Sequence, residues 1–398
     1  MALTKAKKSS KPSMIACKTT IAVGVEGVEN TAGGHGYNIK DPQLEQMRKL
    51  YEWPYPKYEI PTDVKQSWLE IGSKGSEERE KWEERFLNLS KSKQLEFNRI
   101  INLETPKKLS AAIKRLKREI SEKKPKMATR KSSQTALEVI NPIMKETLGG
   151  SADLKESNLV FWPESKAITK KDFSGKYLHY GVREFAMCAI NNGIFLHGGF
   201  RPYASTFLIF SEYAKNAIRM SALMHLPVIY VFTHDSIGLG EDGPTHQAVE
   251  QLSTLRVIPG MSVWRPADVT ETALSWKSSL DKLSGPSSLI LTRQTLPELK
   301  RSKNQIESIQ KGGYVIYDCG KKIDAVIISS GSELHICIEA AENLYKKGIS
   351  VRVISMPCME QFMIQPKSYR DKILPPKIEN VLAVEAGIGV CWDKFIGK

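Results

Sequence analysis

The sequence lacks the features that mark membrane proteins, secreted proteins and disulfide-bonded domains. It has no run of about 18 consecutive apolar residues, which argues against a transmembrane helix. Its basic beginning, MALTKAKKSSKPSM, has none of the apolar stretch that a secretory signal needs. The six cysteines are scattered along the chain without a CxxC pair, so neither a disulfide framework nor a zinc site is expected. These absences favour a globular protein of the reducing cytoplasm that has no membrane partner.

What the chain has in excess is positive charge, concentrated in its first third. The formal net charge is +14, and residues 1–131 hold 28 lysines and arginines against 17 acidic residues. Between Thr105 and Lys131, eleven basic residues stand against two acidic ones. This segment has no interleaved aromatic residues and no recognised binding motif, so a nucleic-acid partner is not predicted. We interpret it as a solvated basic linker helix, whose positive field would favour phosphorylated substrates.

Strand and helix signals alternate along the 398 residues, which predicts an α/β fold of two or three domains. The sheets are expected to be parallel and covered by helices on both faces. Apolar segments rich in β-branched residues predict strands at 13–23, 227–233 and 287–295. Helices are predicted at 184–196, at 207–226, and from Arg130 to a stop at Gly149 and Gly150. Residues 324–356 restart the pattern as one βαβ unit of a separate domain.

The most informative stretch runs from His234 to Gln247 and reads HDSIGLGEDGPTHQ. It follows PVIYVFT, an apolar run that predicts a buried strand. Glycines let backbone amides approach a ligand closely, and open α/β sheets bind ligands beyond the carboxyl ends of their strands. The segment therefore indicates a polar ligand-binding loop, with His234, Asp242 and His246 as its candidate groups.

Six segments with distinctive residues follow one another along the chain. They are GGSADL (149–154), HYGVREF (179–185), HGGFRPYASTFLIFSEYAKNAIRM (197–220), HDSIGLGEDGPTHQ (234–247), WRPAD (264–268) and LTRQTLP (291–297). In this order they closely resemble the transketolases, the thiamine-diphosphate enzymes of the pentose phosphate pathway.

The resemblance implies three α/β domains, of which this chain would hold parts. Residues 1–103 would be the end of the diphosphate-binding domain, 104–129 a basic linker, 130–297 the pyrimidine-binding domain and 298–398 a truncated C-terminal domain. The family's GDG motif, which begins its metal-binding stretch, is absent here. The ligands for the Mg²⁺ or Ca²⁺ that the family uses are therefore also expected to be absent, and no metal-binding residue is assigned.

The implied activity is the reversible transfer of a two-carbon ketol group from a ketose phosphate to an aldose phosphate. In the family each active site forms between subunits, so the implied partner is a second copy or a chain carrying the missing diphosphate-binding domain. The alternative is a non-catalytic truncated remnant or one subunit of a split enzyme. The related deoxyxylulose-phosphate synthases generally lack a histidine matching His234, which favours transketolase. The same residues do not exclude dihydroxyacetone synthase, which is a further alternative.

Residue by residue, the resemblance assigns the cofactor contacts first. Glu184 matches the glutamate that hydrogen-bonds N1′ of the aminopyrimidine, whereas the residues alone would indicate an ordinary acid at a helix N-terminus. Phe207, Phe210 and Tyr213, predicted on one helix face, match aromatic residues around that ring, with Phe210 as its stacking partner. Asp153 matches a residue close to the thiazolium.

The substrate contacts follow from the same resemblance. Arg130, Ser157, His234 and Arg293 match residues that bind the phosphate or nearby hydroxyl groups, and arginine suits phosphate through its rigid fork. Asp242 matches a carboxylate that holds a substrate hydroxyl. His246 matches a histidine near the 4′-amino group, where it can bind or relay a proton. His35 matches a histidine that contacts both cofactor and substrate, although the family continues HGAPLG where this chain reads HGYNIK.

Overall fold

The computed structural model describes residues 1–36, 38–319 and 322–396, and the chain forms two compact units, residues 1–90 and 91–398. The first unit is helical, with α1 (Ala2–Lys8), α2 (Asp41–Leu50), α3 (Thr62–Ser73) and α4 (Ser76–Leu87). The strand predicted at 13–23 is wrong, because this segment is irregular and ends in a turn. Met14 and Ile15 in it are exposed, and no strand lies in the described part of residues 1–90 to pair with it.

The second unit is built on a six-stranded parallel sheet with the order β2-β1-β3-β4-β6-β5. The strands are β1 (Thr147–Ser151), β2 (Tyr177–His179), β3 (Arg201–Phe207), β4 (Ile229–Thr233), β5 (Ser262–Trp264) and β6 (Ser287–Leu291). The predicted parallel α/β sheet is confirmed, and so are the strands predicted near 227–233 and 287–295.

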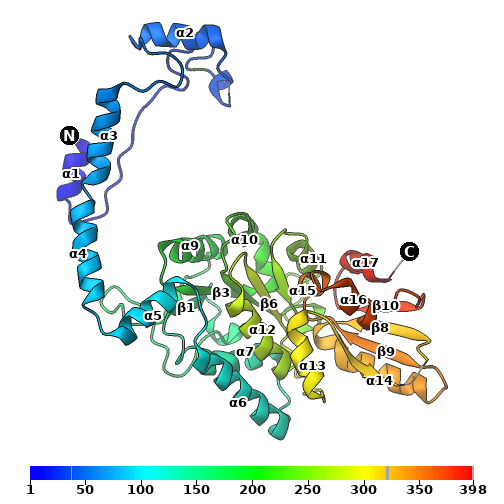
Figure 1. Ribbon diagram of the computed structural model, residues 1–398. Coiled ribbons are helices and arrows are strands. Elements are labelled where there is room, and N and C mark those ends of the chain that lie inside the picture. Colours follow the sequence, from blue (N-terminus) through cyan, green and yellow to red (C-terminus); the bar gives the residue numbers. More distant parts are fainter. Residues whose placement is uncertain (37, 320–321, 397–398) are drawn as a thin grey trace. The chain divides into compact units, whose positions relative to one another are not determined.

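Helices cover both faces of this sheet, as Figure 1 shows. Strand β4 explains why, because its side chains alternate between the faces and all of them are buried. The helices around this sheet are α5 (Lys91–Ile101), α6 (Lys107–Lys123), α7 (Thr129–Ile140), α8 (Lys155–Asn158), α9 (Glu184–His197), α10 (Ser211–Leu223), α11 (Gln251–Arg256) and α12 (Val269–Asp281). Ile229 and Val231 join the core formed with α6, α7 and α12, whereas Tyr230 and Phe232 join the core formed with α9, α10 and α11.

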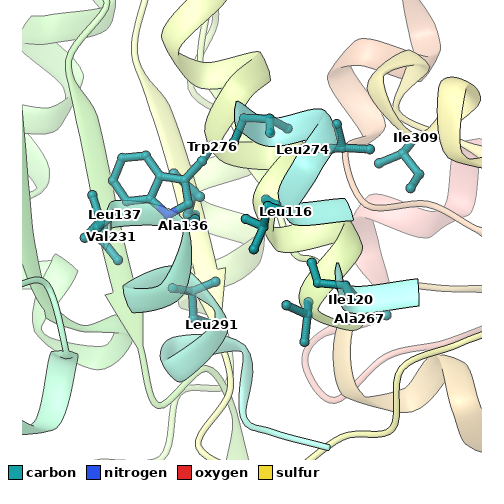
Figure 2. Close-up of a cluster of buried hydrophobic side chains, with 14 of the residues drawn as sticks. Leu116, Ile120, Ala136, Leu137, Val231, Ala267, Leu274, Trp276, Leu291 and Ile309 are labelled. Atoms are coloured by element: carbon teal, nitrogen blue, oxygen red, sulfur yellow. The ribbon is translucent and has the colours of Figure 1, made fainter. Parts of the chain in front are cut away.

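The basic segment after residue 104 is more than a solvated linker. Helix α6 buries the apolar stripe that contains Leu109, Ile113, Leu116 and Ile120, and most of its lysines and arginines are exposed. Figure 2 shows Leu116 and Ile120 in the same cluster as Leu274 of α12. This 3–4 residue spacing of apolar positions is what lets a strongly charged helix pack on a core.

The prediction that Gly149 and Gly150 end a helix is wrong, because both residues lie within strand β1. A Cβ atom on Gly149 would come within 2.0 Å of the Tyr203 ring, and one on Gly150 within 1.9 Å of the Leu178 carbonyl oxygen. These glycines therefore make room for the neighbouring strands. Helix α7 ends earlier, at Ile140.

The C-terminal region forms a second sheet of four strands with the order β10-β8-β9-β7. It contains α13 (Lys303–Ser308), β7 (Tyr314–Asp318), β8 (Ala325–Ser329), α14 (Leu334–Tyr345), β9 (Val351–Ser355), α15 (Met359–Met363), α16 (Lys367–Ile373), β10 (Val381–Val384) and α17 (Asp393–Ile396). The predicted βαβ unit is confirmed as β8-α14-β9, and β7 runs antiparallel to β9. The helices of the described ranges are too short or too polar to span a membrane.

Candidate functional site

Nearly all candidate residues lie where the parallel strands of the six-stranded sheet end. Because the carboxyl ends of parallel strands share one edge, residues distant in sequence are gathered there. This edge carries Asp153 and Ser157 after β1, Glu184 after β2, Phe207, Phe210 and Tyr213 at and after β3, His234, Asp242 and His246 after β4, and Arg293 after β6. Arg130 joins them at the start of α7, where its amide donates to the Thr292 carbonyl at 3.3 Å.

The three aromatic residues form a row of stacked rings, although not on one helix face as predicted. Phe207 is the last residue of β3, Phe210 lies in a short 3-10 turn, and Tyr213 is in the first turn of α10. The ring centroids of Phe207 and Phe210 are 5.8 Å apart and those of Phe210 and Tyr213 are 6.0 Å apart. His246 meets Phe210 edge-on, with centroids 5.4 Å apart. Tyr213 is exposed, so this row can receive a further flat ring.

His234 is buried against this row and held in a strained backbone conformation. Its ring stacks on Phe207 with centroids 3.7 Å apart, and its φ of 56° lies in the left-handed region. Its Nδ1 atom lies 2.8 Å from the Thr233 hydroxyl. Burial lowers the pKa of His234 to about 3, and the nearby cations of Arg130 and Arg293 add to the shift. The imidazole is therefore neutral at physiological pH.

Arg130 and Arg293 place two positive charges beside His234. An Arg130 Nη1 atom donates to the Ser157 carbonyl at 2.7 Å, and Arg130 forms no ion pair within the described residues. Burial, together with the charge of Arg293, lowers the pKa of Arg130. Arg293 donates to the Leu239 carbonyl at 2.5 Å and forms an ion pair at 2.9 Å with Glu241, whose side chain is 79% exposed. Such a surplus of cations is suited to binding an anion.

Glu184 is the first residue of α9 and is only 7% exposed. Within the described residues its carboxylate accepts no hydrogen bond and forms no ion pair. The side chain is largely covered, but its carboxylate oxygens are not among the fully buried polar atoms that lack a partner, so a ligand can reach them. Asp153, with a φ of 59°, and Asp242 are both exposed at the same edge.

Arg265 anchors the start of the loop that begins at His234, through Asp235. The sequence patterns assign no role to this arginine. Arg265 is fully buried and lies 2.8 Å from a carboxylate oxygen of Asp235. It also contacts Glu333 at 2.5 Å and donates to the Ser330 carbonyl at 2.8 Å. The sequence signal is an arginine directly after strand β5, but this position does not by itself predict burial, since Arg293 follows strand β6 and is partly exposed.

His35 lies in the unit of residues 1–90 and is exposed there, so its assignment stays a prediction. Within the described ranges, no three His, Cys, Asp or Glu side chains are grouped so that they could hold a metal ion.

Comparison with known proteins connects these features. Residues 1–106 match the family model of the transketolase thiamine diphosphate binding domain, 125–298 that of the transketolase pyrimidine binding domain, and 312–398 that of the transketolase-like C-terminal domain. The chain belongs to the transketolase family.

Individual transketolases agree with this assignment over almost the whole chain. The chain is 46% identical to a transketolase of Buchnera aphidicola and 44% identical to transketolase 1 of Escherichia coli, in each case over 98% of its length. It spans 59% of each of these two relatives.

Two solved structures extend the comparison. A Pichia stipitis transketolase complexed with sedoheptulose-7-phosphate matches 99% of the chain and 58% of that protein, with a TM-score of 0.89 and 36% identity. A split-gene transketolase, described as an inactive β4 tetramer, matches 68% of the chain and 86% of that protein, with a TM-score of 0.54 and 25% identity. The site residues from Arg130 to Arg293 all fall within the pyrimidine binding domain.

Proposed function

We propose that this chain supplies the pyrimidine-side wall of a thiamine-diphosphate site in a transketolase that transfers a two-carbon ketol group between sugar phosphates. The observation that carries the proposal is the meeting, at one sheet edge, of the stacked aromatic row, the unpartnered Glu184 carboxylate and the cations beside His234. An aromatic surface, a buried proton-sharing carboxyl and an anion site are the three things this chemistry requires of the protein.

The residues present fit the aminopyrimidine part of thiamine diphosphate. Phe210 is half-buried, and its neighbours Phe207 and Tyr213 lie at centroid distances of 5.8 Å and 6.0 Å, so part of its ring can contact a flat ligand. Glu184 offers a carboxylate whose hydrogen-bonding capacity is unused within the described residues. When bound, the cofactor supplies the electron sink for cleaving the bond beside a ketose carbonyl. The protein's part is to orient the ring, to share a proton between Glu184 and the ring nitrogen, and to exclude water.

The remaining residues would receive the sugar phosphate. We assign the phosphate to Arg130 and Arg293, since guanidinium groups bind phosphate oxygens in a bidentate manner. Arg293 would exchange its exposed partner Glu241 for the phosphate. Asp242 and His234 would contact substrate hydroxyl groups, and His246 would stand at the aromatic row to bind or relay a proton. The sugar phosphate bound in the Pichia stipitis relative supports this substrate class.

No step is assigned to a metal ion, because the described residues offer no metal-binding group. We therefore infer that the metal and the diphosphate are held by a thiamine diphosphate-binding domain more complete than the one matched by residues 1–106. The six cysteines are unpaired, which agrees with a cytoplasmic protein.

The experiment is a ketol-transfer assay from xylulose 5-phosphate to ribose 5-phosphate. We expect no transfer by the purified chain alone. We expect transfer when a chain carrying the complete thiamine diphosphate-binding domain of the Escherichia coli relative is added. Robust turnover by the chain alone would contradict the inference that the diphosphate side must be supplied. No transfer in any mixture would favour the alternative, a non-catalytic member of the family.

We further propose that the partner binds the outer face of α9 and α10. This face exposes large apolar side chains, which in a soluble protein mark interaction surfaces. They include Phe185, Ile190 and Leu196 of α9 and Met220 and Leu223 of α10. The occupant is a second chain of the same family, either another copy or a chain carrying the diphosphate-binding domain.

Sedimentation velocity tests this surface. Leu196→Glu combined with Leu223→Glu should weaken association with either family partner at least tenfold, because two charges would lose their hydration. The matched control is Phe173→Glu, since Phe173 is 77% exposed and lies outside these helices. Equal association of both variants would refute the proposed surface.

A further inference from the structure

The C-terminal sheet reaches the ligand-binding edge of the six-stranded sheet through one buried side chain. Arg265 follows β5, its amide donates to the Pro357 carbonyl at 2.8 Å, and its own carbonyl accepts from the Gly331 amide at 3.0 Å. Its Nη1 atom donates to the Ser330 carbonyl at 2.8 Å, and its Nη2 atom donates to the Ser332 hydroxyl at 3.2 Å. The guanidinium therefore lies in the loop that follows β8 and precedes α14.

That loop lies where an open α/β sheet ordinarily binds a ligand, beyond the carboxyl end of a parallel strand. Here the guanidinium of Arg265 fills the position, and its charge is balanced by Glu333 at 2.5 Å. A Cβ atom on Gly331, whose φ is 60°, would come within 2.7 Å of the Arg265 Cζ atom, so the loop closes tightly on this one group. The C-terminal sheet thus uses its ligand-binding edge to hold a side chain of the neighbouring sheet.

The same guanidinium also holds the residue that follows His234 in the ligand loop. Its Nε atom donates to Oδ2 of Asp235 at 3.0 Å, and its Nη2 atom lies 2.8 Å from the same oxygen. The two side chains are at most 1% exposed, and Arg265 is the only cation that pairs with Asp235 within the described residues. Because a buried carboxylate is strongly held by its one counter-charge, Asp235 is fixed wherever Arg265 is fixed.

His234 needs such support because its backbone is strained. Its φ of 56° lies in the left-handed region, which a residue other than glycine keeps only where the surrounding structure fixes it. On one side, Thr233 is fixed by the pairing of β4 with β3 and β6. On the other side, Asp235 is fixed by Arg265. In the conformation held between these two anchors, the His234 ring stacks on Phe207 with centroids 3.7 Å apart.

We propose that Arg265 is a positioning residue through which the C-terminal sheet fixes the backbone and the ring of His234. Arg265 is fully buried behind the loop and so does not touch a ligand itself. The C-terminal region would then shape the ligand site, although none of the candidate site residues belongs to it. The use of this loop to bind a sugar phosphate rests on the proposed function, whereas the coupling between the two sheets does not.

The NMR signals of the His234 ring measure this coupling in the full chain. Protons held over the face of Phe207 should resonate upfield of their position in the urea-unfolded chain, and ¹H–¹³C spectra with ¹³C-labelled histidine record this displacement. His234→Gln identifies the signals among those of the seven histidines. Arg265→Met should reduce the upfield displacement by about half or more, because Asp235 is released and the strained backbone relaxes. An unchanged displacement in Arg265→Met would overturn the proposal.

Arg301→Met is the matched control for the loss of a buried arginine. Arg301 is 1% exposed, is paired with Asp268, and donates to the Tyr314 hydroxyl of β7 at 2.6 Å, so it also joins the two sheets. Within the described ranges it makes no hydrogen bond or ion pair with the loop after β4. Arg301→Met should therefore leave the His234 signals in place. If both variants displace them equally, the effect comes from general loosening of the chain, and the positioning role of Arg265 is refuted.

Glycine variants in the C-terminal region keep the proposal testable if Arg265→Met fails to fold. Gly331→Ala retains every charge but displaces the guanidinium of Arg265, so it should also reduce the upfield displacement of the His234 signals. Gly348→Ala is the matched control, because its φ of 84° imposes a similar backbone strain whereas its Cβ atom would meet no residue beyond its chain neighbours within 4 Å. Unchanged signals in Gly331→Ala, or equal changes in both variants, would overturn the proposal.

None of these measurements needs cofactor, substrate or turnover. Failure of the coupling between the sheets and failure of ketol transfer are therefore separate results.

Discussion

Arg265→Met should cost the second unit about 3–5 kcal/mol of unfolding free energy, which is the usual cost of removing one partner from a buried ion pair. Arg265 is fully buried, and its partners Asp235 and Glu385 are 1% and 2% exposed. Methionine keeps much of the aliphatic volume but leaves Asp235 without a cation. Glu385 keeps its second partner, Arg256, at 2.6 Å. Glu333, the third acidic partner of Arg265, is 16% exposed and keeps its bonds to the Ser332 hydroxyl and the Ala386 amide. Most of the loss should therefore come from Asp235.

Urea unfolding of the full chain, followed by tryptophan fluorescence and far-UV circular dichroism, measures this cost. The indole of Trp392 donates to Glu385 at 2.9 Å and so reports on the same network. The control is Lys367→Met, which removes an exposed helical pair with Asp371 and should cost about 0.3–0.5 kcal/mol. An Arg265→Met cost below about 1 kcal/mol, or equal to that of the control, would refute the reasoning.

The pH dependence of this loss gives a second check. Burial already raises the pKa of Asp235 and the Arg265 cation opposes that shift, so removal of the cation must raise the pKa further. A carboxyl whose pKa is higher in the folded than in the unfolded chain destabilises the fold as pH rises. The deficit of Arg265→Met should therefore be larger at pH 8 than at pH 5. A deficit that does not change with pH would contradict the account.

Three further predictions concern other parts of the second unit. Burial raises the pKa of Glu298 to about 7, above its unfolded value, so the unfolding free energy should fall as the pH rises from about 4.5 to 7. Glu298→Gln should reduce this fall by roughly 1–3 kcal/mol, as measured by urea unfolding at pH 5 and pH 8. Gly149→Ala should cost about 1–3 kcal/mol because its Cβ would strike Tyr203, whereas Gly193→Ala, in open space on α9, should stabilise the chain by up to about 1 kcal/mol in the same assay. In the complemented enzyme, Arg130→Met should raise KM for ribose 5-phosphate roughly tenfold or more and leave KM for unphosphorylated ribose unchanged, since it removes only a charge-assisted bond to phosphate. Equal changes in KM for both sugars would contradict the assignment of Arg130 to the phosphate.

The parts of the fold that the sequence predicts well are those in which one physical cause dominates. The run before His234 predicts a buried strand because it is short and consists almost entirely of β-branched and aromatic residues. Arg293 was expected near the end of the next predicted strand, and the strand does end just before it. The shared edge of a parallel sheet then brings both residues together, whatever their distance in sequence.

The wrong predictions concern residues whose type or spacing is compatible with two different local structures. Gly149 and Gly150 suit a helix stop as well as a crowded strand, and only the position of Tyr203 decides between them. Phe207 and Phe210 have helical spacing, yet a strand end followed by a 3-10 turn also stacks their rings. The role of Arg265 depends on the C-terminal region, which lies about 65 residues further along the chain.

The central claim is that Glu184 acts on the cofactor ring and does more than stabilise a helix. Glu212 provides the matched comparison, because it is also an acid in the first turn of a helix but is exposed. In ketol transfer by the complemented enzyme, Glu184→Gln should lower the rate by at least about a hundredfold, the lower range for loss of a proton-transfer group. Glu212→Gln should keep the rate of the unaltered chain. Equal rates for the two variants would contradict the account.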